Sequence, residues 1–252
     1  IADQHLHHEA VDLRLGQRIG ALGLDRVLRR HDDEGLGHAV RLMPPAYVKP
    51  YIKRQKNDAA DAEAICEAVT RANMRFVETK TPGQQSCLML HRTRHLFIRQ
   101  QTAVINAIRA HLAEFGIVAP VGRNGVEDLL GVVADPSDKR VPEVARTCLT
   151  ALGAQLRMLK AQILEFDRMI SAWHQSNETS KRLDAIPGVG PALATALVAS
   201  VPDPKAFRSG RHFSAWVGLV PKHSSGGREK LGSISKQGDR TIRRLLVVGA
   251  TA

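Results

Sequence analysis

The sequence predicts a mostly α-helical protein, and three observations carry this prediction. Apolar residues recur at helical spacing over residues 84–115 and again over 143–177, and a segment rich in small residues follows the Pro-Gly-Val-Gly turn at 187–190. Only short β segments are expected, at 40–43 and 75–77. With 43% hydrophobic but only 4% aromatic residues, the core must consist of Leu, Ala, Val and Ile.

Residues 1–34 have an atypical composition. They hold four of the eleven histidines and five arginines, but no Lys, Ser, Thr, Pro, Asn or aromatic residue. The chain also begins without Met and ends on an apolar run, 245–252. We therefore expect a chain that is truncated at both ends, with a first segment that is disordered or translated from a shifted reading frame.

A helix is predicted over residues 57–72. Asn57 can cap it, and Asp58 and Asp61 lie in its first turn, where carboxylates interact favourably with the helix dipole. Because the two aspartates are three residues apart, they share one face of the helix and could bind Mg²⁺ together. The alternative is that they only stabilise the start of the helix.

Two long amphipathic helices are predicted, at 84–115 and 143–177. The segment between them, 116–142, is broken by Pro and Gly, with at most a helical turn near 126–130. Two such helices joined by a loop predict an antiparallel coiled-coil hairpin, which could be a spacer or a dimerisation arm. The apolar stripes consist of Leu88, Leu90, Leu96, Ile98, Val104, Ile105, Ile108 and Leu112, and of Leu149, Leu152, Leu156, Leu159, Ile163, Leu164 and Ile170.

Cysteine content and hydropathy indicate in which cellular environment the chain is expected. The three cysteines, Cys66, Cys87 and Cys148, form neither a disulfide framework nor a zinc pattern, so we expect reduced, buried thiols. No stretch is long and apolar enough for a membrane span, and no signal peptide is evident. We expect a soluble, cytoplasmic protein with no membrane partner.

The net charge of +11 predicts a polyanionic partner. Residues 205–244 contain ten basic residues against Glu229 and Asp239, so this stretch alone carries +8 (ten minus two). The basic residues are Lys205, Arg208, Arg211, Lys222, Arg228, Lys230, Lys236, Arg240, Arg243 and Arg244.

The Pro-Gly-Val-Gly turn precedes this basic stretch. Gly188 and Gly190 allow tight turns at a helix N-terminus, where backbone N–H groups can bind a phosphate. This pattern is typical of a helix-hairpin-helix element, which reads the DNA backbone without sequence preference. The alternative is a helix-to-helix turn without a ligand, but the basic stretch that follows favours DNA.

A second motif, KHSSGG at 222–227, places two serines before two glycines. A serine that attacks a phosphodiester needs an exposed hydroxyl, backbone that can approach closely, and cations to bear the developing charge. The motif meets these needs, with Ser224 and Ser225 as candidates. Taken alone, however, such a stretch is more often a flexible turn, in which His223 is simply exposed.

Three parts of the sequence together resemble the insertion-sequence one-ten family of transposases. They are GLGHAVRLMPPAYVKPYIKRQKNDAADAEAI (35–65), the long helical hairpin, and IPGVG followed by FSAWVGLVPKHSSGGREKLGSISKQGDRTIRRLL. The resemblance implies a remnant of a RuvC-like, ribonuclease H type α/β domain at 35–82, a coiled-coil arm at 83–180 and a C-terminal transposase domain, with its helix-hairpin-helix, at 181–252.

The resemblance also implies chemistry for particular residues. Asp58 and Asp61 in KNDAADA match the last two residues of the family's Asp-Glu-Asp-Asp set, which binds Mg²⁺, and Ser225 matches the serine nucleophile. Residues 1–34 offer no strand context for the first Asp and the Glu, so we expect this chain to be catalytically impaired. The DNA contacts would be made by Gly188, Gly190, Arg211, Lys222, Arg228, Lys230, Lys236 and Arg240.

The expected function is thus that of a transposase, a DNA recombinase of a mobile element. Its partners would be DNA, an element-encoded bridge RNA and further copies of the chain, near the nucleoid of a bacterium or archaeon. Two alternatives remain open: a non-catalytic helix-hairpin-helix DNA-binding module, and a Holliday-junction nuclease that uses only the metal carboxylates.

Overall fold

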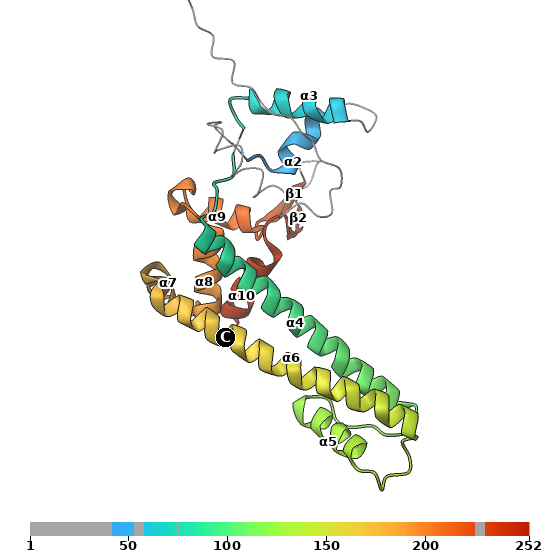
Figure 1. Cartoon of the computed structure of the whole chain (residues 1–252). Helices are drawn as coiled ribbons and strands as arrows, with labels where there is room; N and C mark the ends of the chain where they lie inside the picture. Colours follow the sequence, from blue (N-terminus) through green and yellow to red (C-terminus); the bar gives the residue numbers. More distant parts are fainter. Residues whose placement is uncertain (1–41, 53–57, 75, 225–229, 252) are drawn as a thin grey trace, which may run out of the picture. The chain divides into compact units, whose positions relative to one another are not determined.

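The computed structural model describes residues 42–52, 58–74, 76–224 and 230–251 (Figure 1). The chain divides into two compact units, Ile1–Thr79 and Lys80–Ala252. The described part is mostly helical, as predicted. None of its helices is both long and apolar enough to span a lipid bilayer.

The described part of the first unit is built from short helical segments. Leu42 and Val77 form an isolated antiparallel bridge, in which the Val77 N–H donates to the Leu42 carbonyl at 2.7 Å. In their described residues, the two predicted strands therefore meet in a single bridge. Ala64 and Ala68, one helical turn apart, are buried. The helices are α2 (Pro45–Val48), the 3₁₀ helix η1 (Lys49–Tyr51) and α3 (Asp58–Val69).

Two long helices dominate the second unit, α4 (Pro82–Ala113) and α6 (Glu143–Ser176), which run side by side as a helical hairpin (Figure 1). A capping box starts α4: the Thr81 hydroxyl accepts from the Gln84 N–H, and the Gln84 side chain accepts from the Thr81 N–H. The predicted helices are confirmed to within two residues at each end. Their shared core includes Val104, Ile108, Leu112, Leu149, Leu156 and Leu159.

The predicted apolar stripes were too broad. Leu96 is 46% exposed on α4 and Leu164 is 52% exposed on α6. Periodicity over some thirty residues cannot exclude such positions, because the strip of each helix that is buried depends on where its partner helices lie.

The loop region between the two helices contains a full helix, α5 (Arg123–Ala134), where only a helical turn was predicted. It buries Val126, Leu129 and Val133 against the far end of the hairpin. Gly125 and Gly131 weakened the helical signal in the sequence, and packing against α4 and α6 overrides their low propensity.

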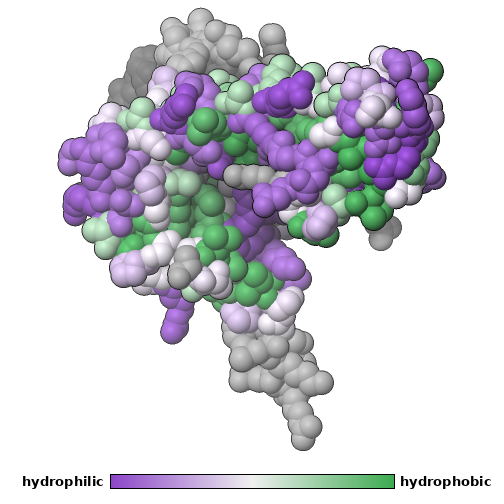
Figure 2. Space-filling view, turned by 90° about the horizontal axis from the view of Figure 1, so that it is seen from below, coloured by the Kyte–Doolittle hydropathy of each residue, from purple (hydrophilic) through white to green (hydrophobic). Residues whose placement is uncertain are grey.

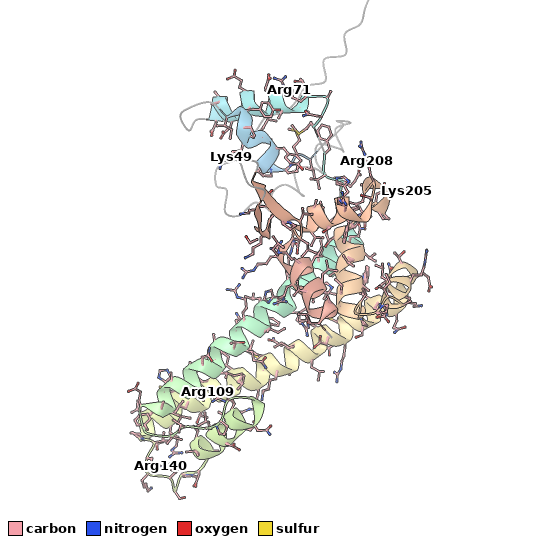
Figure 3. All side chains as sticks on the ribbon, turned by 180° about the vertical axis from the view of Figure 1, so that it is seen from behind. Lys49, Arg71, Arg109, Arg140, Lys205 and Arg208 are labelled. Carbon is pink, nitrogen blue, oxygen red and sulfur yellow. The ribbon has the colours of Figure 1, made fainter. Side chains whose placement is uncertain are left out.

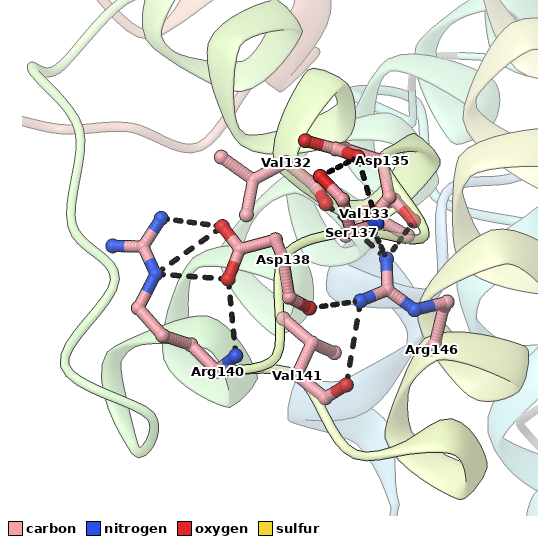
Figure 4. Close-up of polar contacts among 8 residues, drawn as sticks. All are labelled: Val132, Val133, Asp135, Ser137, Asp138, Arg140, Val141 and Arg146. Atoms are coloured by element: carbon pink, nitrogen blue, oxygen red, sulfur yellow. Dashed lines mark hydrogen bonds and ion pairs between the residues drawn. The ribbon is translucent and has the colours of Figure 1, made fainter.

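Arg146 organises the chain that links α5 to α6 (Figure 4). Its guanidinium donates to five backbone carbonyls. The closest contacts are 2.6 Å to Val133, 2.6 Å to Asp138 and 2.7 Å to Asp135. It also reaches the carbonyls of Val132 and Val141. The last carbonyls of α5 have no partner within the helix, so a cation that binds them satisfies them and opposes the helix dipole.

The small-residue helix α8 (Pro191–Ser200) lies where the start of α4 and the end of α6 diverge (Figure 1). Apolar or small side chains cover all its faces, which is typical of a helix buried on every side. Its buried residues are Leu193, Ala194, Thr195, Ala196, Ala199 and Ser200. The short helix α7 (Glu178–Asp184) follows α6 and packs against α8.

The rest of the unit is a small mixed region. Strands β1 (Pro221–Ser224) and β2 (Lys230–Ile234) pair antiparallel, with Ser224 opposite Lys230. This hairpin was not predicted, because its strands have four and five residues and no clear alternation. The helical elements are the 3₁₀ helix η2 (Pro204–Ala206), α9 (Gly210–Val217) and α10 (Arg240–Ala250).

The prediction of three buried thiols is right only for Cys87. Cys66 and Cys148 are exposed. Both lie on helix faces that no other described element covers, which a count of cysteines cannot reveal.

Candidate nucleic-acid interface

Polar contacts hold α8 onto α4. His91 Nε2 and Thr195 Oγ1 are 2.9 Å apart, and the Thr195 hydroxyl donates to the Pro191 carbonyl at 2.7 Å. The threonine proton is thus used within α8, so His91 Nε2–H is the donor to Thr195. Burial, with a smaller effect of the Arg94 charge, lowers the His91 pKa to about 4. His91 is therefore neutral at pH 7.

The same surface of α4 makes two further contacts with α8. The Gln84 side chain donates to the Val198 carbonyl at 3.1 Å, and Cys87 Sγ lies 3.9 Å from the Thr195 carbonyl. Burial raises the pKa of the Cys87 thiol to about 11, so it is an uncharged packing group. The position of α8 is therefore fixed by contacts with residues more than 100 positions earlier in the chain.

Gly188 and Gly190, the two glycines of the turn before α8, have different surroundings. The Val189 N–H donates to the Ile186 carbonyl at 2.9 Å, and Gly188 has φ +80°, so Pro187 and Gly188 occupy the central positions of a type II turn. A Cβ on Gly188 would lie 2.3 Å from the Gly249 carbonyl oxygen of α10. Gly188 therefore has a packing role, whatever else it does.

Gly190 is the N-cap of α8 and lies in open space, since an added Cβ would meet nothing within 4 Å. The helix start is thus open to a ligand. Pro191, the first helical residue, has no N–H, so this terminus offers one donor fewer than an ordinary helix start. The helix α7, the turn and α8 have the order expected of a helix-hairpin-helix element.

A second close contact positions α9. Gly218 ends α9 in the left-handed region, with φ +83°, and a Cβ there would lie 2.7 Å from the Gln237 nitrogen. Arg243 reaches back from α10 and donates to the carbonyls of Val217 (2.9 Å) and Gly238 (3.2 Å). One of the ten basic residues is therefore structural, because it holds α10 against the end of α9.

The predicted DNA-contact side chains that the structure describes are exposed. Arg211 lies in the first turn of α9, Lys222 on β1, Lys236 in the loop after β2, and Arg240 at the start of α10. Lys205 and Arg208, which the sequence listed among the basic residues, are also exposed, and Figure 3 shows them next to each other beside α9. Among the described residues, none of these six side chains has a carboxylate within 4.0 Å.

Asp239 is the described acidic residue between 205 and 244, and its carboxylate is used as a helix cap. The Asp239 carboxylate caps α10 by accepting from the N–H groups of Thr241 and Ile242, at 2.8 and 2.9 Å. The space-filling view in Figure 2 shows hydrophobic side chains in separate small patches with hydrophilic ones between them. The exposed cations are therefore available to an external anion.

Two basic residues that the sequence did not single out belong to the same electrostatic environment. Burial and the positive charge of Arg92 lower the pKa of Lys80, while Asp239 acts in the opposite direction. Lys80 is thus close enough to both Arg92 and Asp239 to sense their charges, although Asp239 follows it by more than 150 residues. No local sequence pattern could have revealed this, because the fold alone brings them together.

The candidate nucleophile lies outside the described residues. Ser225 follows β1 directly, and Arg228 lies in the same undescribed segment, 225–229. Lys230 opens β2, but its side chain is not described. The prediction that Ser225 reacts with DNA therefore stays a prediction.

The candidate metal ligands lie in the first unit. Asp58 and Asp61 occupy the first turn of α3, Asp58 exposed and Asp61 partly buried. Among the described residues, no group of three or more His, Cys, Asp or Glu side chains is placed to hold a metal ion. Mg²⁺ often takes one or two protein carboxylates and completes its shell with water and substrate phosphates. That Asp58 and Asp61 bind Mg²⁺ therefore stays a prediction.

Comparison with known proteins gives this arrangement a context. Residues 180–252 match the family model described as "Transposase IS116/IS110/IS902 family". The chain is 50% identical over 218 residues to the protein y4pF/y4sB of Sinorhizobium fredii, which carries the name of a transposase. It is 40% identical over 221 residues to the transposase for insertion sequence element IS1328 of Yersinia enterocolitica, and 40% identical over 220 residues to the transposase for IS1111A of Coxiella burnetii.

These matches cover 86%, 87% and 86% of the chain, but 56%, 65% and 60% of the respective relatives. The chain thus spans between half and two thirds of the length of these relatives. The family match includes α8, α9, the β-hairpin and α10, the elements that carry the exposed basic residues. By its sequence, the segment 180–252 belongs to the IS116/IS110/IS902 family of insertion-sequence transposases, and most of the chain is similar to proteins named as transposases.

Proposed function

We propose that this chain acts on DNA in the transposition of an insertion sequence, and that the region from α7 to α10 binds the DNA backbone. The observation that carries the proposal is the set of exposed cations without a carboxylate partner in the described residues. They lie in the same segment that matches the transposase family model. Phosphate contacts of this kind provide affinity and orientation rather than sequence recognition.

In this proposal the helix-hairpin-helix element is formed by α7, the type II turn and α8. The open N-terminus of α8 at Gly190 would face a phosphate, while Gly188 holds the turn against α10. Arg211, Lys222, Lys236 and Arg240 would bind further phosphates, together with Arg228 and Lys230. A bridge RNA, as in the family that the sequence resembles, would bind through the same kind of phosphate contacts.

The proposed chemistry is strand transfer through Ser225. Its Oγ would bond to the DNA phosphorus, the bond from phosphorus to the leaving strand oxygen would break, and the serine proton would pass to a base while the leaving oxygen gains one. Asp58 and Asp61 would hold Mg²⁺, which when bound would neutralise charge on the phosphate. Since the acidic pair and the serine lie in different units, we expect an oligomer with composite sites.

Because this chain lacks the first Asp and the Glu of the family's set, the test of the chemistry uses an intact relative, with substitutions at the positions of Ser225 and Ser224. It looks for a covalent adduct with a DNA substrate, detected by gel shift after denaturation. Ser225→Ala should abolish the adduct and leave DNA binding intact, whereas the control Ser224→Ala should retain both. Loss of the adduct with Ser224→Ala alone would reassign the nucleophile. DNA cleavage without any adduct in the wild type would favour the Holliday-junction nuclease.

The test of binding is its dependence on salt. Because each neutralised phosphate releases counterions, the affinity for duplex DNA should fall steeply with salt concentration. Arg211→Ala and Lys222→Ala should each reduce the slope of log affinity against log salt by about one. Binding that is insensitive to salt would refute the interface. Binding without any strand chemistry would favour the second candidate, a non-catalytic DNA-binding module.

A further inference from the structure

Aromatic side chains are scarce in this chain, yet three of the ten Phe, Tyr and Trp residues cluster around α9. The ring centroids of Phe207 and Phe213 are 5.3 Å apart and those of Phe207 and Trp216 are 5.4 Å apart, both edge to face. Phe213 and Trp216 stack at 5.9 Å with an interplanar angle of 27°. Each ring therefore fixes the orientation of the others.

The cluster is open on one side. Phe207 and Phe213 are partly buried, whereas Trp216 is 39% exposed. An indole packed on one side by two rings and open to solvent on the other presents a rigid aromatic surface. Burial of such a surface by a ligand costs little side-chain entropy, because the ring is already held in place.

The backbone that carries the cluster is held by local hydrogen bonds. Ser209 caps α9 by accepting from the His212 N–H at 3.3 Å, and the Arg208 N–H donates to His212 Nδ1 at 3.4 Å. At the other end, a Cβ on Gly238 would lie 2.1 Å from the Trp216 carbonyl oxygen, so the loop before α10 packs directly on this end of the helix. The rings are thus fixed by both ends of α9.

The segment that carries the cluster is positively charged. Residues 204–217 contain Lys205, Arg208 and Arg211 but no Asp or Glu, and all three cations are exposed. The nearest preceding acid, Asp203, accepts a hydrogen bond from the Lys205 backbone N–H at 2.8 Å. Arg208 follows Phe207 directly in the chain, so the cluster and an exposed cation lie in the same short segment.

The arm tip shows that exposed apolar residues alone do not make such a surface. Val118, Val121 and Val144 are 79%, 98% and 78% exposed there, but none is aromatic. The neighbouring Arg140 is paired with Asp138 at 2.6 Å. At α9, by contrast, an exposed aromatic ring lies in one segment with exposed cations that have no carboxylate partner in the described residues.

We propose that the surface formed by Trp216, Phe207, Lys205 and Arg208, here called the α9 platform, binds unpaired bases of single-stranded DNA. A strand with exposed bases is the occupant that matches both properties, because its bases stack on aromatic rings and its phosphates attract the cations. An apolar protein surface would leave the cations without partners. This inference rests on the proposed function and extends it from the duplex backbone to DNA that is locally melted.

The test compares three probes with the full chain: a (dT)12 oligonucleotide, an abasic 12-mer with the same phosphates, and a DNA duplex. Binding is followed by fluorescence anisotropy of the labelled probe. Trp216→Leu, which keeps apolar volume but removes the aromatic ring, should weaken (dT)12 binding by about 5- to 150-fold. The same variant should leave the affinities for the abasic 12-mer and the duplex unchanged, and Trp216→Phe should restore most of the (dT)12 affinity.

Intrinsic fluorescence gives an independent measurement, since the chain has only two tryptophans. The second, Trp173, packs against the buried cluster of Cys87, Leu88 and Ala199. Stacking of a base on Trp216 should quench the emission of the wild type with (dT)12, and this quenching should disappear in Trp216→Phe. Arg208→Ala should weaken both single-stranded probes, whereas Arg140→Ala at the arm tip should weaken neither.

The outcomes separate this inference from the proposed function. Equal affinity for (dT)12 and the abasic 12-mer, without quenching, would refute the platform while salt-dependent duplex binding still supports the interface. Tighter binding of (rU)12 than of (dT)12 would overturn the assignment to DNA. A change in oligomeric state on Trp216→Leu, without a change in (dT)12 affinity, would assign the surface to a second copy of the chain.

Discussion

His91 couples the stability of the second unit to pH, and the structure gives the size of the effect. His91 lies on α4, and its side chain is 9% exposed where α4 packs against α8. Burial, with a smaller effect of the Arg94 charge, lowers its pKa from 6.5 to about 4. In the unfolded chain the imidazole binds a proton below about pH 6.5, whereas in the folded chain it stays neutral down to about pH 4. Folding therefore becomes less favourable as the pH falls through this window.

The magnitude follows from the two pKa values. At 1.36 kcal/mol per pH unit, the full difference corresponds to about 3 kcal/mol, of which about 2 kcal/mol is already lost at pH 5. The perturbation is His91→Gln, in which the amide N–H can still donate to Thr195 but nothing titrates. The variant should lose about 2 kcal/mol less than the wild type between pH 7.5 and pH 5.

The assay is urea unfolding followed by far-UV circular dichroism at the two pH values. The comparison of variants removes the contribution of carboxylates that titrate in both proteins. His111→Gln, at an exposed histidine in the last turn of the same helix, serves as the matched control and should keep the wild-type pH dependence. An unchanged pH dependence in His91→Gln would refute the assignment of a neutral, buried His91.

Three further predictions concern positions that hold the second unit together. Arg146→Ala should destabilise the arm by about 2–4 kcal/mol, because it leaves the carbonyls at the end of α5 without a partner; hydrogen exchange should show lost protection confined to residues 123–142, and global loss would contradict this. Gly249→Ala should open the contact of α10 with the turn before α8, since its Cβ would lie 2.0 Å from the Gly188 carbonyl oxygen, and should accelerate proteolysis after residue 186. The control Gly131→Ala, with nothing within 4 Å, should be neutral or stabilising. Asp239→Ala should remove the cap of α10 and lower the free energy of unfolding by about 1 kcal/mol. Melting curves at low salt can measure this loss, and Asp239→Asn, which keeps a capping side chain, serves as the control.

The sequence predicted the long helices because their signal is local. The stripes of α4 and α6 repeat over some thirty residues, so each helix is visible in its own segment of the sequence. The concentration of positive charge between 205 and 244 was also visible, because exposure of Lys and Arg follows from their hydration and needs no knowledge of the fold. The family resemblance likewise rests on linear motifs.

The sequence could not separate the roles of similar residues within that charged region. Arg243 and Arg240 are three positions apart on α10, yet Arg243 binds the carbonyls at the end of α9 while Arg240 is exposed. Gly188 and Gly190 looked like one phosphate-binding motif, but one packs on Gly249 and the other opens the helix start. These assignments depend on which backbone atoms lie opposite, and the partners are tens of residues away.

What the sequence determined by itself is therefore the helical arm, the small-residue helix and the net charge of the C-terminal segment, all properties of neighbouring residues. The tertiary structure alone decided that α8 lies between α4 and α6, that His91 is neutral against Thr195, and that the three aromatic rings around α9 meet in one cluster. The physical reason is that burial and electrostatics act through space. They set the role of a side chain only when distant segments pack around it.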